Sequence, residues 1–283
     1  MAPKAIPIGR PGAGRYRRAV LIDVTDPNDE RLSDFAGLRD AQLRRSDERR
    51  FIAEGVKIIE RAFAAGCRPR SLLLQPRWLA GVEPLLERWP EVPVYVSTEA
   101  LIEKISGFHV HRGALGSFDR PAEATWEQIA GARRVIVCEE IVDHANIGAI
   151  CRVAAGLGWD AVIVSPGSAD PLYRRAIKAS MGASLSLPWR RMDSDADLIR
   201  LREAGFALVA STLSTAAVDL ASFEAPVKVA LLLGTEGRGL SGAWLAAADH
   251  HVTIPMAQGV DSLNVAAAAA ILAYGLAPSV QSP

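Results

Sequence analysis

The fold is decided by the stretch Ile254-Pro255-Met256-Ala257-Gln258-Gly259-Val260-Asp261-Ser262-Leu263-Asn264-Val265-Ala266-Ala267. A short apolar run that contains Pro255 ends at Met256, and a polar loop follows. An alanine-rich helix is predicted over residues 263–276. Ser262 stands where the N-cap of that helix is expected. The helix is apolar on all sides, which predicts burial. Ser262 and Asn264 at its start therefore need polar partners, and they serve either as caps or as part of a site.

The composition is that of a globular protein. The 283 residues suffice for two domains, and 49% of them are apolar. The net charge of zero excludes a globally basic field, so any surface for nucleic acid must be local. Cys67, Cys138 and Cys151 lack C-x-x-C spacing, which predicts neither a disulfide framework nor a zinc site. We find no signal peptide and no membrane-spanning run, so the predicted compartment is the cytosol, without a membrane partner.

Residues 1–18 are predicted to form a flexible basic arm. They contain five Lys and Arg residues, several Pro and Gly residues, and no acidic residue. Such an arm is either a solvated tail or a segment that contacts phosphates.

Residues 19–118 have the pattern of a small α/β domain. Helices are predicted at 31–45, 56–65 and 78–88, and strands at 51–55, 71–74 and 92–96. The charged run 44–50 is by default a solvated helix end, and its alternative role is phosphate contact. The loop 107–113 carries two histidines, but further ligands are missing, so a polar surface loop is favoured over a metal site.

Residues 119–127 are the predicted linker, and residues 128–283 form a second domain. Strands alternate with helices there, which predicts a parallel sheet covered on both faces. The predicted strands are 134–138, 161–164, 185–188, 206–211, 227–233 and 251–254. The predicted helices are 147–157, 171–180, 195–204, 241–247 and 263–276.

Three loops follow predicted strands, at the edge where α/β sheets bind ligands. In the first loop Asn146 is a candidate N-cap, Gly148 permits close backbone approach, and Arg152 is expected to pair with an anion. The second loop, residues 234–240, lacks the Lys and Ser or Thr of a P-loop and reverses the Rossmann glycine spacing. ATP and a dinucleotide are therefore disfavoured. Its three glycines suit a tight turn around a small ligand. The third loop is the opening stretch.

Together these loops resemble the motifs of the SpoU branch of the SPOUT superfamily of RNA methyltransferases. The family pattern Asn-x-Gly-x-x-x-Arg matches Asn146, Gly148 and Arg152. The pattern Gly-x-Glu-Gly-x-Gly-Leu matches residues 234–240, and Ile-Pro-Met followed by Ser-Leu-Asn-Val matches 254–256 and 262–265. The likeness is strong over residues 133–276 and weaker over 40–118.

The resemblance implies both a fold and an activity. The second domain would be a parallel-sheet α/β domain with a deep trefoil knot, an exception to the rule that chains do not thread loops. The first would be a ribosomal-protein-like α/β domain that binds the RNA substrate. Family members are homodimers that use S-adenosyl-L-methionine, and no metal, to methylate a ribose 2′-oxygen of rRNA or tRNA. We favour rRNA slightly.

The resemblance also assigns residues. The implied catalytic residues are Asn146, Arg152, Glu236, Ser262 and Asn264. The implied cofactor-binding residues are Thr212, Leu233, Gly234, Gly239, Ile254, Met256 and Leu263. The implied RNA-binding residues are Arg44, Arg45, Arg49, His111, Arg112 and Arg174.

The chemistry requires a very weak acid, a ribose hydroxyl, to attack a sulfonium methyl group. Alignment can supply several kcal/mol, and some group must take the proton or stabilise the oxyanion. The family proposal makes the arginine the base. Because arginine stays protonated, Arg152 acts either as that base or as a cation that holds phosphate and stabilises the oxygen. Two other classes remain: a non-catalytic RNA-binding or assembly protein on the same fold, and a nucleotide-dependent oxidoreductase, which the glycine spacing disfavours.

Overall fold

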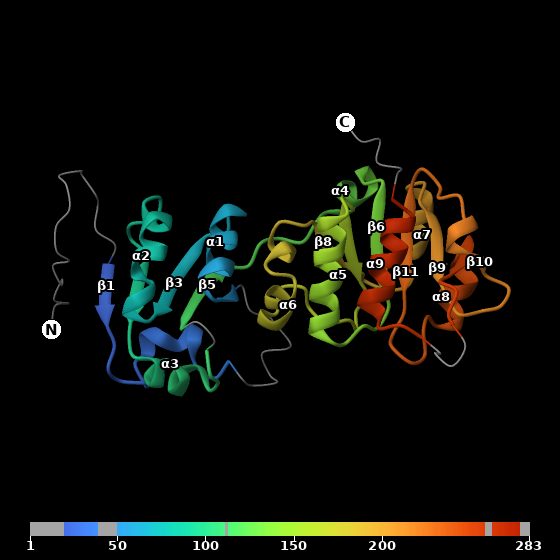
Figure 1. The fold of residues 1–283 in the computed structure, drawn as a ribbon. Helices are drawn as coiled ribbons and strands as arrows, with labels where there is room; N and C mark the ends of the chain where they lie inside the picture. The colour runs from blue at the N-terminus through green and yellow to red at the C-terminus, as the bar shows by residue number, and fades with distance from the viewer. Residues whose placement is uncertain (1–19, 39–49, 111–112, 258–261, 278–283) are drawn as a thin grey trace. The chain divides into compact units, whose positions relative to one another are not determined.

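The computed structural model describes residues 20–38, 50–110, 113–257 and 262–277. The chain divides into two compact units, Met1–Pro121 and Ala122–Pro283 (Figure 1). The division lies within residues 119–127, where the linker is predicted. That range also contains the last residue of β5 and the first two residues of α4.

The N-terminal unit is built on a five-stranded mixed sheet in the order β1-β4-β3-β5-β2. Strands β1, β4 and β3 are parallel, and β5 runs antiparallel to β3 and β2. The strands are β1 (Val20–Asp23), β2 (Arg50–Glu54), β3 (Pro69–Leu74), β4 (Pro93–Val96) and β5 (Ala114–Asp119). The helices are η1 (Glu30–Phe35), α1 (Val56–Ala64), η3 (Pro76–Trp78), α2 (Leu79–Val82), η4 (Glu83–Leu86) and α3 (Glu99–Ser106), where η marks a 3-10 helix.

Most predictions for this unit are confirmed. The strands predicted at 51–55, 71–74 and 92–96 are β2, β3 and β4, and the helix at 56–65 is α1. The predicted helix at 31–45 is present only as the short 3-10 helix η1, and residues 39–49 lie outside the described residues. The single helix at 78–88 is wrong. The chain forms η3, α2 and η4 there, because Gly81 and Pro84 are poor residues for a helix interior. Sequence periodicity missed β1, β5 and α3.

Asp34 of η1 holds that helix against the sheet. Its carboxylate accepts a hydrogen bond from Ser117 Oγ at 2.6 Å and one from Arg70 Nε at 2.9 Å. Arg50 Nε forms an ion pair with it at 3.4 Å. Partial burial raises the pKa of Asp34, but the hydrogen bonds from Ser117 and Arg70 and the charges of both arginines outweigh that effect and lower the pKa.

Asp34→Asn is expected to lower the free energy of unfolding by about 1–3 kcal/mol near pH 7, because charged hydrogen bonds are lost. The native pKa of Asp34 is depressed, so its stabilising contribution is present above the unfolded pKa of about 3.9 and is lost as the pH falls through the native pKa. Urea unfolding at several pH values should therefore show the wild type and the variant converging below about pH 4. Glu60→Gln, at an exposed site on α1, is the control. A difference that stays constant with pH would contradict this account.

The C-terminal unit contains a seven-stranded parallel sheet in the order β10-β12-β9-β11-β6-β7-β8. The strands are β6 (Arg134–Cys138), β7 (Ala161–Val164), β8 (Trp189–Arg191), β9 (Ala207–Ser211), β10 (Val218–Asp219), β11 (Val229–Leu233) and β12 (His250–Thr253). The helices are α4 (Trp126–Gly131), α5 (His144–Gly156), α6 (Arg174–Ala179), η5 (Ala183–Leu185), α7 (Asp197–Glu203), η6 (Leu220–Ser222), α8 (Gly242–Ala247) and α9 (Val265–Gly275). The predicted parallel α/β sheet is confirmed.

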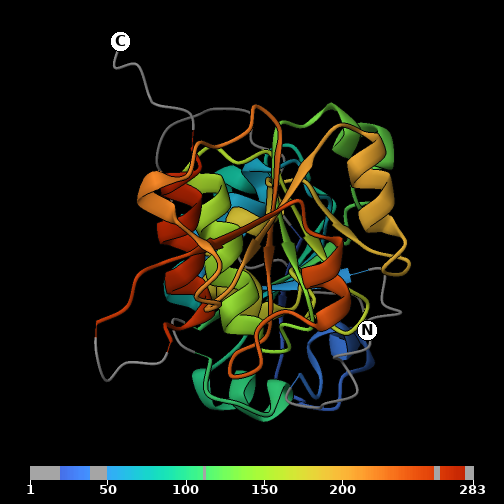
Figure 2. The ribbon, with the colours of Figure 1, turned by 90° about the vertical axis from the view of Figure 1, so that its right-hand side faces the viewer.

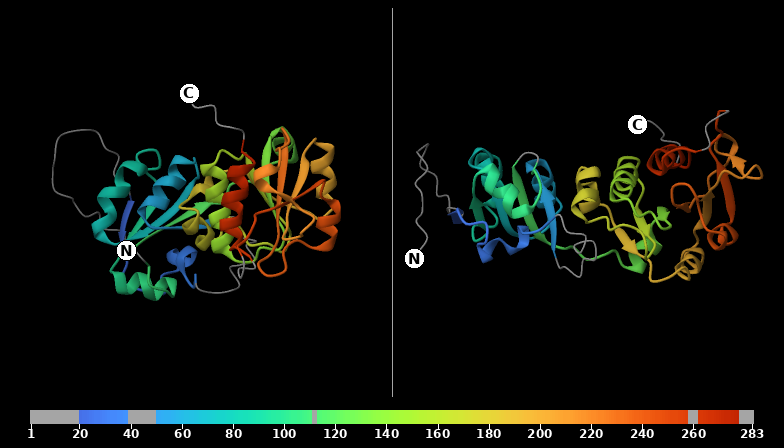
Figure 3. Two further views of the ribbon diagram at one scale, coloured as in Figure 1. Left: turned by 45° about the vertical axis from the view of Figure 1, so that its right-hand side comes forward. Right: turned by 90° about the horizontal axis from the view of Figure 1, so that it is seen from below.

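Helices cover both faces of this sheet. Figure 2 shows α5 and α9 on one face and α4, α7 and α8 on the other. Ile129, Leu198 and Trp244 from the second group pack into one core with β-strand residues. On the first face α5 packs against both α6 and α9, and the three helices lie in a row (Figure 3). Cys138 and Cys151 are fully buried, and burial raises the pKa of the Cys151 thiol to about 12, so both act as small core residues.

Predictions for two elements of this unit are wrong. Residues 185–188 are not a strand: η5 ends at Leu185, and β8 begins after Pro188. The last helix is not buried on all sides. It buries Val265, Ala269 and Leu272 but exposes Ile271 and Tyr274. A uniformly apolar helix has no polar face that could reveal which side meets the core.

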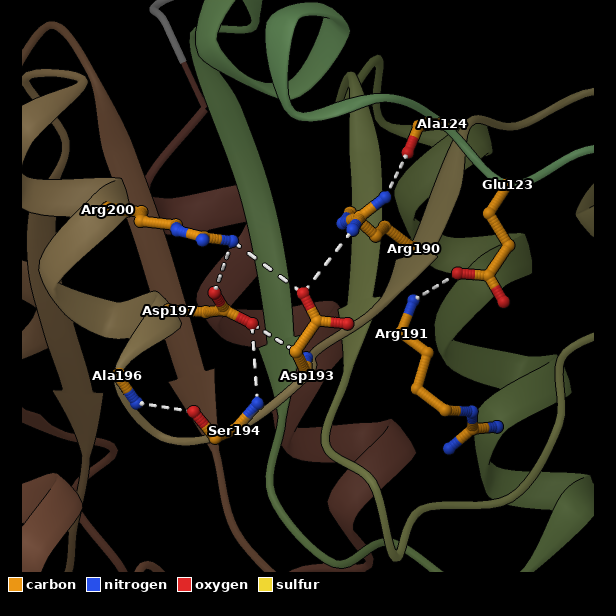
Figure 4. Close-up of polar contacts among 9 residues, drawn as sticks. All are labelled: Glu123, Ala124, Arg190, Arg191, Asp193, Ser194, Ala196, Asp197 and Arg200. Atoms are coloured by element: carbon orange, nitrogen blue, oxygen red, sulfur yellow. Dashed lines mark hydrogen bonds and ion pairs between the residues drawn. The ribbon is translucent and has the colours of Figure 1, made fainter.

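The edge strand β8 is covered by the segment that leads into α4 (Figure 4). The amide of Ala124 donates to the Trp189 carbonyl at 2.8 Å, and Arg190 Nη1 donates to the Ala124 carbonyl at 3.1 Å. The Arg191 amide donates to Glu123 Oε2 at 2.9 Å. These bonds satisfy backbone groups that an edge strand would otherwise expose.

Candidate functional site

Three polar side chains from distant segments meet at the carboxyl edge of the parallel sheet. Asn146 lies in the first turn of α5, Glu236 in the loop after β11, and Asn264 directly before α9. Asn146 Nδ2 donates to Glu236 Oε1 at 3.0 Å, and Asn264 Nδ2 donates to the same oxygen at 2.6 Å. Asn264 Nδ2 also donates to Asn146 Oδ1 at 3.1 Å. We call these three residues the polar latch.

The latch joins all three sequence motifs at one point. Asn146 is buried, whereas Glu236 and Asn264 are exposed, so a large substrate can reach the latch from solvent. A carboxylate that accepts two amide donors holds both asparagines in a defined orientation. The arrangement is therefore suited to aligning the loops of a site.

Both predicted caps at this edge are wrong. The N-cap of α5 is Asp143, whose carboxylate accepts from the Ala145 amide at 2.8 Å, because the helix begins earlier than predicted. Asn146 is thereby free to bind Glu236. The N-cap of α9 is Asn264, whose Oδ1 accepts from the Ala266 amide at 3.0 Å. Ser262 is exposed, and the described part of the chain shows no hydrogen bond from it to the latch.

Arg152 does not join the latch. It lies six residues after Asn146 on α5, which places the two side chains about 120° apart around the helix. Its side chain is exposed, and within the described ranges no residue forms a hydrogen bond or ion pair with it. The anion predicted to pair with Arg152 is thus not one of the described residues of the same chain.

The loop after β11 folds back on itself. The Gly239 amide donates to the Thr235 carbonyl at 2.9 Å. A Cβ on Gly234 would collide with the backbone of Gly239 and Leu240, so only glycine permits this crossing. Gly237 adopts a φ of 85°, in the left-handed region that favours glycine. The predicted tight turn is confirmed.

Sequence reasoning missed Glu139, which anchors the end of that loop. Its carboxylate is buried and accepts from the Ser241 amide at 2.7 Å, which ties the start of α8 to the end of β6. Its position in the sequence could have indicated this role, because a carboxylate directly after a fully buried strand needs a hydrogen-bond partner.

The predicted cofactor-binding residues lie at the carboxyl ends of three neighbouring strands. Thr212 follows β9, Leu233 ends β11 and Ile254 follows β12, and these parallel strands are adjacent in the sheet. Leu233 is buried, whereas Gly234, Ile254 and Met256 are half-buried. Backbone groups beside half-buried apolar side chains are the lining expected of a site for a small molecule. Leu263 lies beyond residues 258–261, which are outside the described residues.

Of the predicted RNA-binding residues, the structure describes only Arg174. It begins α6 and is half-buried. The others, Arg44, Arg45, Arg49, His111 and Arg112, lie outside the described residues, as does the basic arm 1–18. In the described ranges, no three His, Cys, Asp or Glu side chains are grouped so that they could hold a metal ion. No described helix is both long and apolar enough to cross a membrane.

Comparisons with known proteins agree with this geometry. The sequence model of the SpoU rRNA Methylase family matches residues 133–274, and that of the MRM3-like substrate binding domain matches residues 31–114. An uncharacterized tRNA/rRNA methyltransferase of Mycobacterium tuberculosis is 42% identical over 261 residues, which are 89% of this chain and 90% of that protein.

Two further relatives have more specific names. The 23S rRNA (guanosine(2553)-2′-O)-methyltransferase RlmP of Bacillus subtilis is 31% identical over 150 residues, 53% of this chain and 60% of that protein. The crystal structure of an AdoMet-bound rRNA methyltransferase from Sinorhizobium meliloti superposes with a TM-score of 0.80 at 26% identity, over 93% of this chain and 99% of that one. S-adenosylmethionine is therefore the cofactor, and the chain belongs to the SpoU family of RNA methyltransferases.

Proposed function

We propose that this protein transfers the methyl group of S-adenosylmethionine to a ribose 2′-hydroxyl of RNA, with rRNA preferred over tRNA. The polar latch carries the proposal, because it holds the three motif loops together beside the ends of β9, β11 and β12. The name of the Bacillus subtilis relative, a 2′-O-methyltransferase of rRNA, supports the ribose and the rRNA. A non-catalytic role is not favoured, because every latch residue is retained.

The bound cofactor supplies a methyl group on a positively charged sulfur. The backbone of residues 233–240 and 254–256 would hold it, with Thr212 and Leu263 beside it. The latch residues Asn146, Glu236 and Asn264 keep these loops in register. We assign Arg152 the role of a cation that binds the target phosphate and stabilises charge on the attacking oxygen, since guanidinium stays protonated.

The test uses labelled S-adenosylmethionine and RNA from cells that lack this protein, resolved by size and then hydrolysed with alkali. A 2′-O-methyl group blocks cleavage at its own nucleotide, so the expected product is a labelled alkali-resistant dinucleotide from the large RNA. Label only in mononucleotides would overturn the ribose assignment, and label only in the small RNA would overturn the preference for rRNA.

We also propose a homodimer that forms through α9. Ala267, Ile271 and Tyr274 follow one another along one side of that helix and are exposed, Tyr274 by 75%. Contiguous exposed apolar side chains mark interaction surfaces. A second copy of the chain would cover this stripe.

Ile271→Arg is expected to yield a monomer with strongly reduced methyl transfer, because a charge in the centre of an apolar interface is costly to bury. Light scattering coupled to size exclusion measures the mass. Ile199→Arg is the matched control, because Ile199 is 60% exposed on α7, across the sheet from α9. A dimer that survives Ile271→Arg would refute the interface.

The remaining assignments are also proposals. The N-terminal unit binds RNA, as the match to a substrate binding domain suggests, and the basic residues 1–18 and 44–50 contact phosphates. The C-terminal segment forms the trefoil knot. In support, α9 packs on α5, and its Ala273 carbonyl accepts from Trp159 Nε1 at 3.1 Å. The three free, buried cysteines fit a reducing compartment such as the cytosol.

A further inference from the structure

An aromatic pair lies at the same edge of the sheet as the polar latch and has no part in the site described above. His144 is the first residue of α5, and Tyr173 directly precedes α6. Their ring centroids are 4.2 Å apart, and the rings are tilted by 47°. Both side chains are half-buried, so each keeps part of its surface open to solvent.

The pair and the latch share one edge of the sheet. Helix α5 follows β6 and α6 follows β7, and these strands are adjacent and parallel, so both helices begin at the carboxyl edge. His144 precedes Asn146 by two residues, which turns its side chain about 160° away from the latch. It faces α6, while Asn146 faces the loop after β11. The two groups therefore lie on opposite sides of one helix end, about 10 Å apart.

The helix that follows Tyr173 is basic. Helix α6 carries Arg174, Arg175 and Lys178 and no carboxylate. The guanidinium carbon of Arg174 lies 6.0 Å from the centroid of the Tyr173 ring, the outer limit of a cation–π contact. Aromatic rings beside several cations are the combination that binds single-stranded nucleic acid.

We propose that His144 and Tyr173 form a stacking platform for an unpaired nucleobase of the substrate RNA, beside the ribose that is methylated. RNA-binding proteins recognise unpaired bases by stacking them on Tyr and His rings. Arg175, which is exposed, binds a neighbouring phosphate. The stacked base belongs to a neighbour of the target nucleotide, because the ribose that is methylated must itself reach the cofactor loops on the other side of α5. This inference rests on the proposed RNA methyl transfer.

Tyr173→Leu tests the platform, because it keeps an apolar side chain of similar reach but removes the ring. Stacking of one base is worth about 1–3 kcal/mol, so KM for RNA from cells lacking the protein should rise about 5- to 150-fold. The affinity for S-adenosylmethionine, measured by calorimetry, should not change. Tyr173→Phe keeps the ring and should restore the wild-type KM.

Phe223→Leu is the matched control. Phe223 pairs with His250 at a centroid distance of 5.3 Å, but His250 begins β12 and so lies at the amino edge of the sheet. The KM of Phe223→Leu for RNA should equal that of the wild type. Ultraviolet cross-linking of RNA to the wild-type protein, followed by peptide mapping, should place an adduct on His144 or Tyr173.

A wild-type KM in Tyr173→Leu would overturn the platform. A KM that is raised in both Tyr173→Leu and Tyr173→Phe would also overturn it. The same holds if the raised KM of Tyr173→Leu comes with a lower affinity for the cofactor or a lower melting temperature, since each of these results would indicate a structural role. Failure of the proposed function can be distinguished from failure of the platform, because the wild type would then transfer no methyl group to ribose. The cross-link would still show whether RNA reaches these two rings.

Discussion

Glu236→Ala is expected to reduce kcat/KM for RNA methylation about 100-fold, the size of effect that a misplacement of about 1 Å produces. The variant removes the oxygen that accepts from both Asn146 and Asn264. The buried amide of Asn146 loses a partner, and the loop after β11 is no longer tied to α5 and α9. Affinity for S-adenosylmethionine should fall as well, because the same loop is proposed to hold it. Calorimetry and initial rates with labelled cofactor measure both effects.

Glu236→Gln separates geometry from charge. Its amide oxygen can still accept from both asparagines, so the latch should persist and cofactor affinity should stay within about threefold of wild type. Since Glu236 is assigned here as a positioning residue, most of the turnover should remain. Equal losses in the alanine and glutamine variants would show that the negative charge matters in its own right, and would contradict the latch.

Arg152→Lys is expected to lower kcat about 100- to 1,000-fold, which is the loss typical of removing a group that stabilises charge in the transition state. Lysine keeps the charge but lacks the planar fork of donors that fits phosphate. Because the Arg152 side chain is exposed and forms no hydrogen bond or ion pair with the described residues, melting temperature and cofactor affinity should stay at their wild-type values. Single-turnover rates, calorimetry and thermal unfolding measure the three quantities.

Arg133→Lys is the matched control for this prediction. Arg133 is also exposed, but it precedes β6 at the amino edge of the sheet, away from the latch. Its kcat should match that of the wild type. Full activity in Arg152→Lys would remove Arg152 from the mechanism, and a loss of cofactor binding would assign it a structural role instead.

Sequence periodicity predicted the elements whose local pattern was strong. Strands β6, β7 and β11 are short, nearly uninterrupted apolar runs, as expected for strands buried on both faces. The same periodicity predicted the ends and interruptions of helices and strands less accurately. Gly81 and Pro84 divided a predicted helix, and β8 began only after Pro188. These differences follow from backbone geometry that a count of apolar residues does not register.

By itself the sequence determined the class of fold, the order of the three motifs, and their place after strands. It could not determine which polar side chains would meet. Asn146 and Glu236 are 90 residues apart, and Asn146 and Asn264 are 118 residues apart. Only the parallel sheet brings them within hydrogen-bonding distance, because it gathers the carboxyl ends of its strands at one edge. The tertiary structure likewise decided that Arg152 faces solvent and which side of α9 is buried, because both depend on contacts remote in sequence.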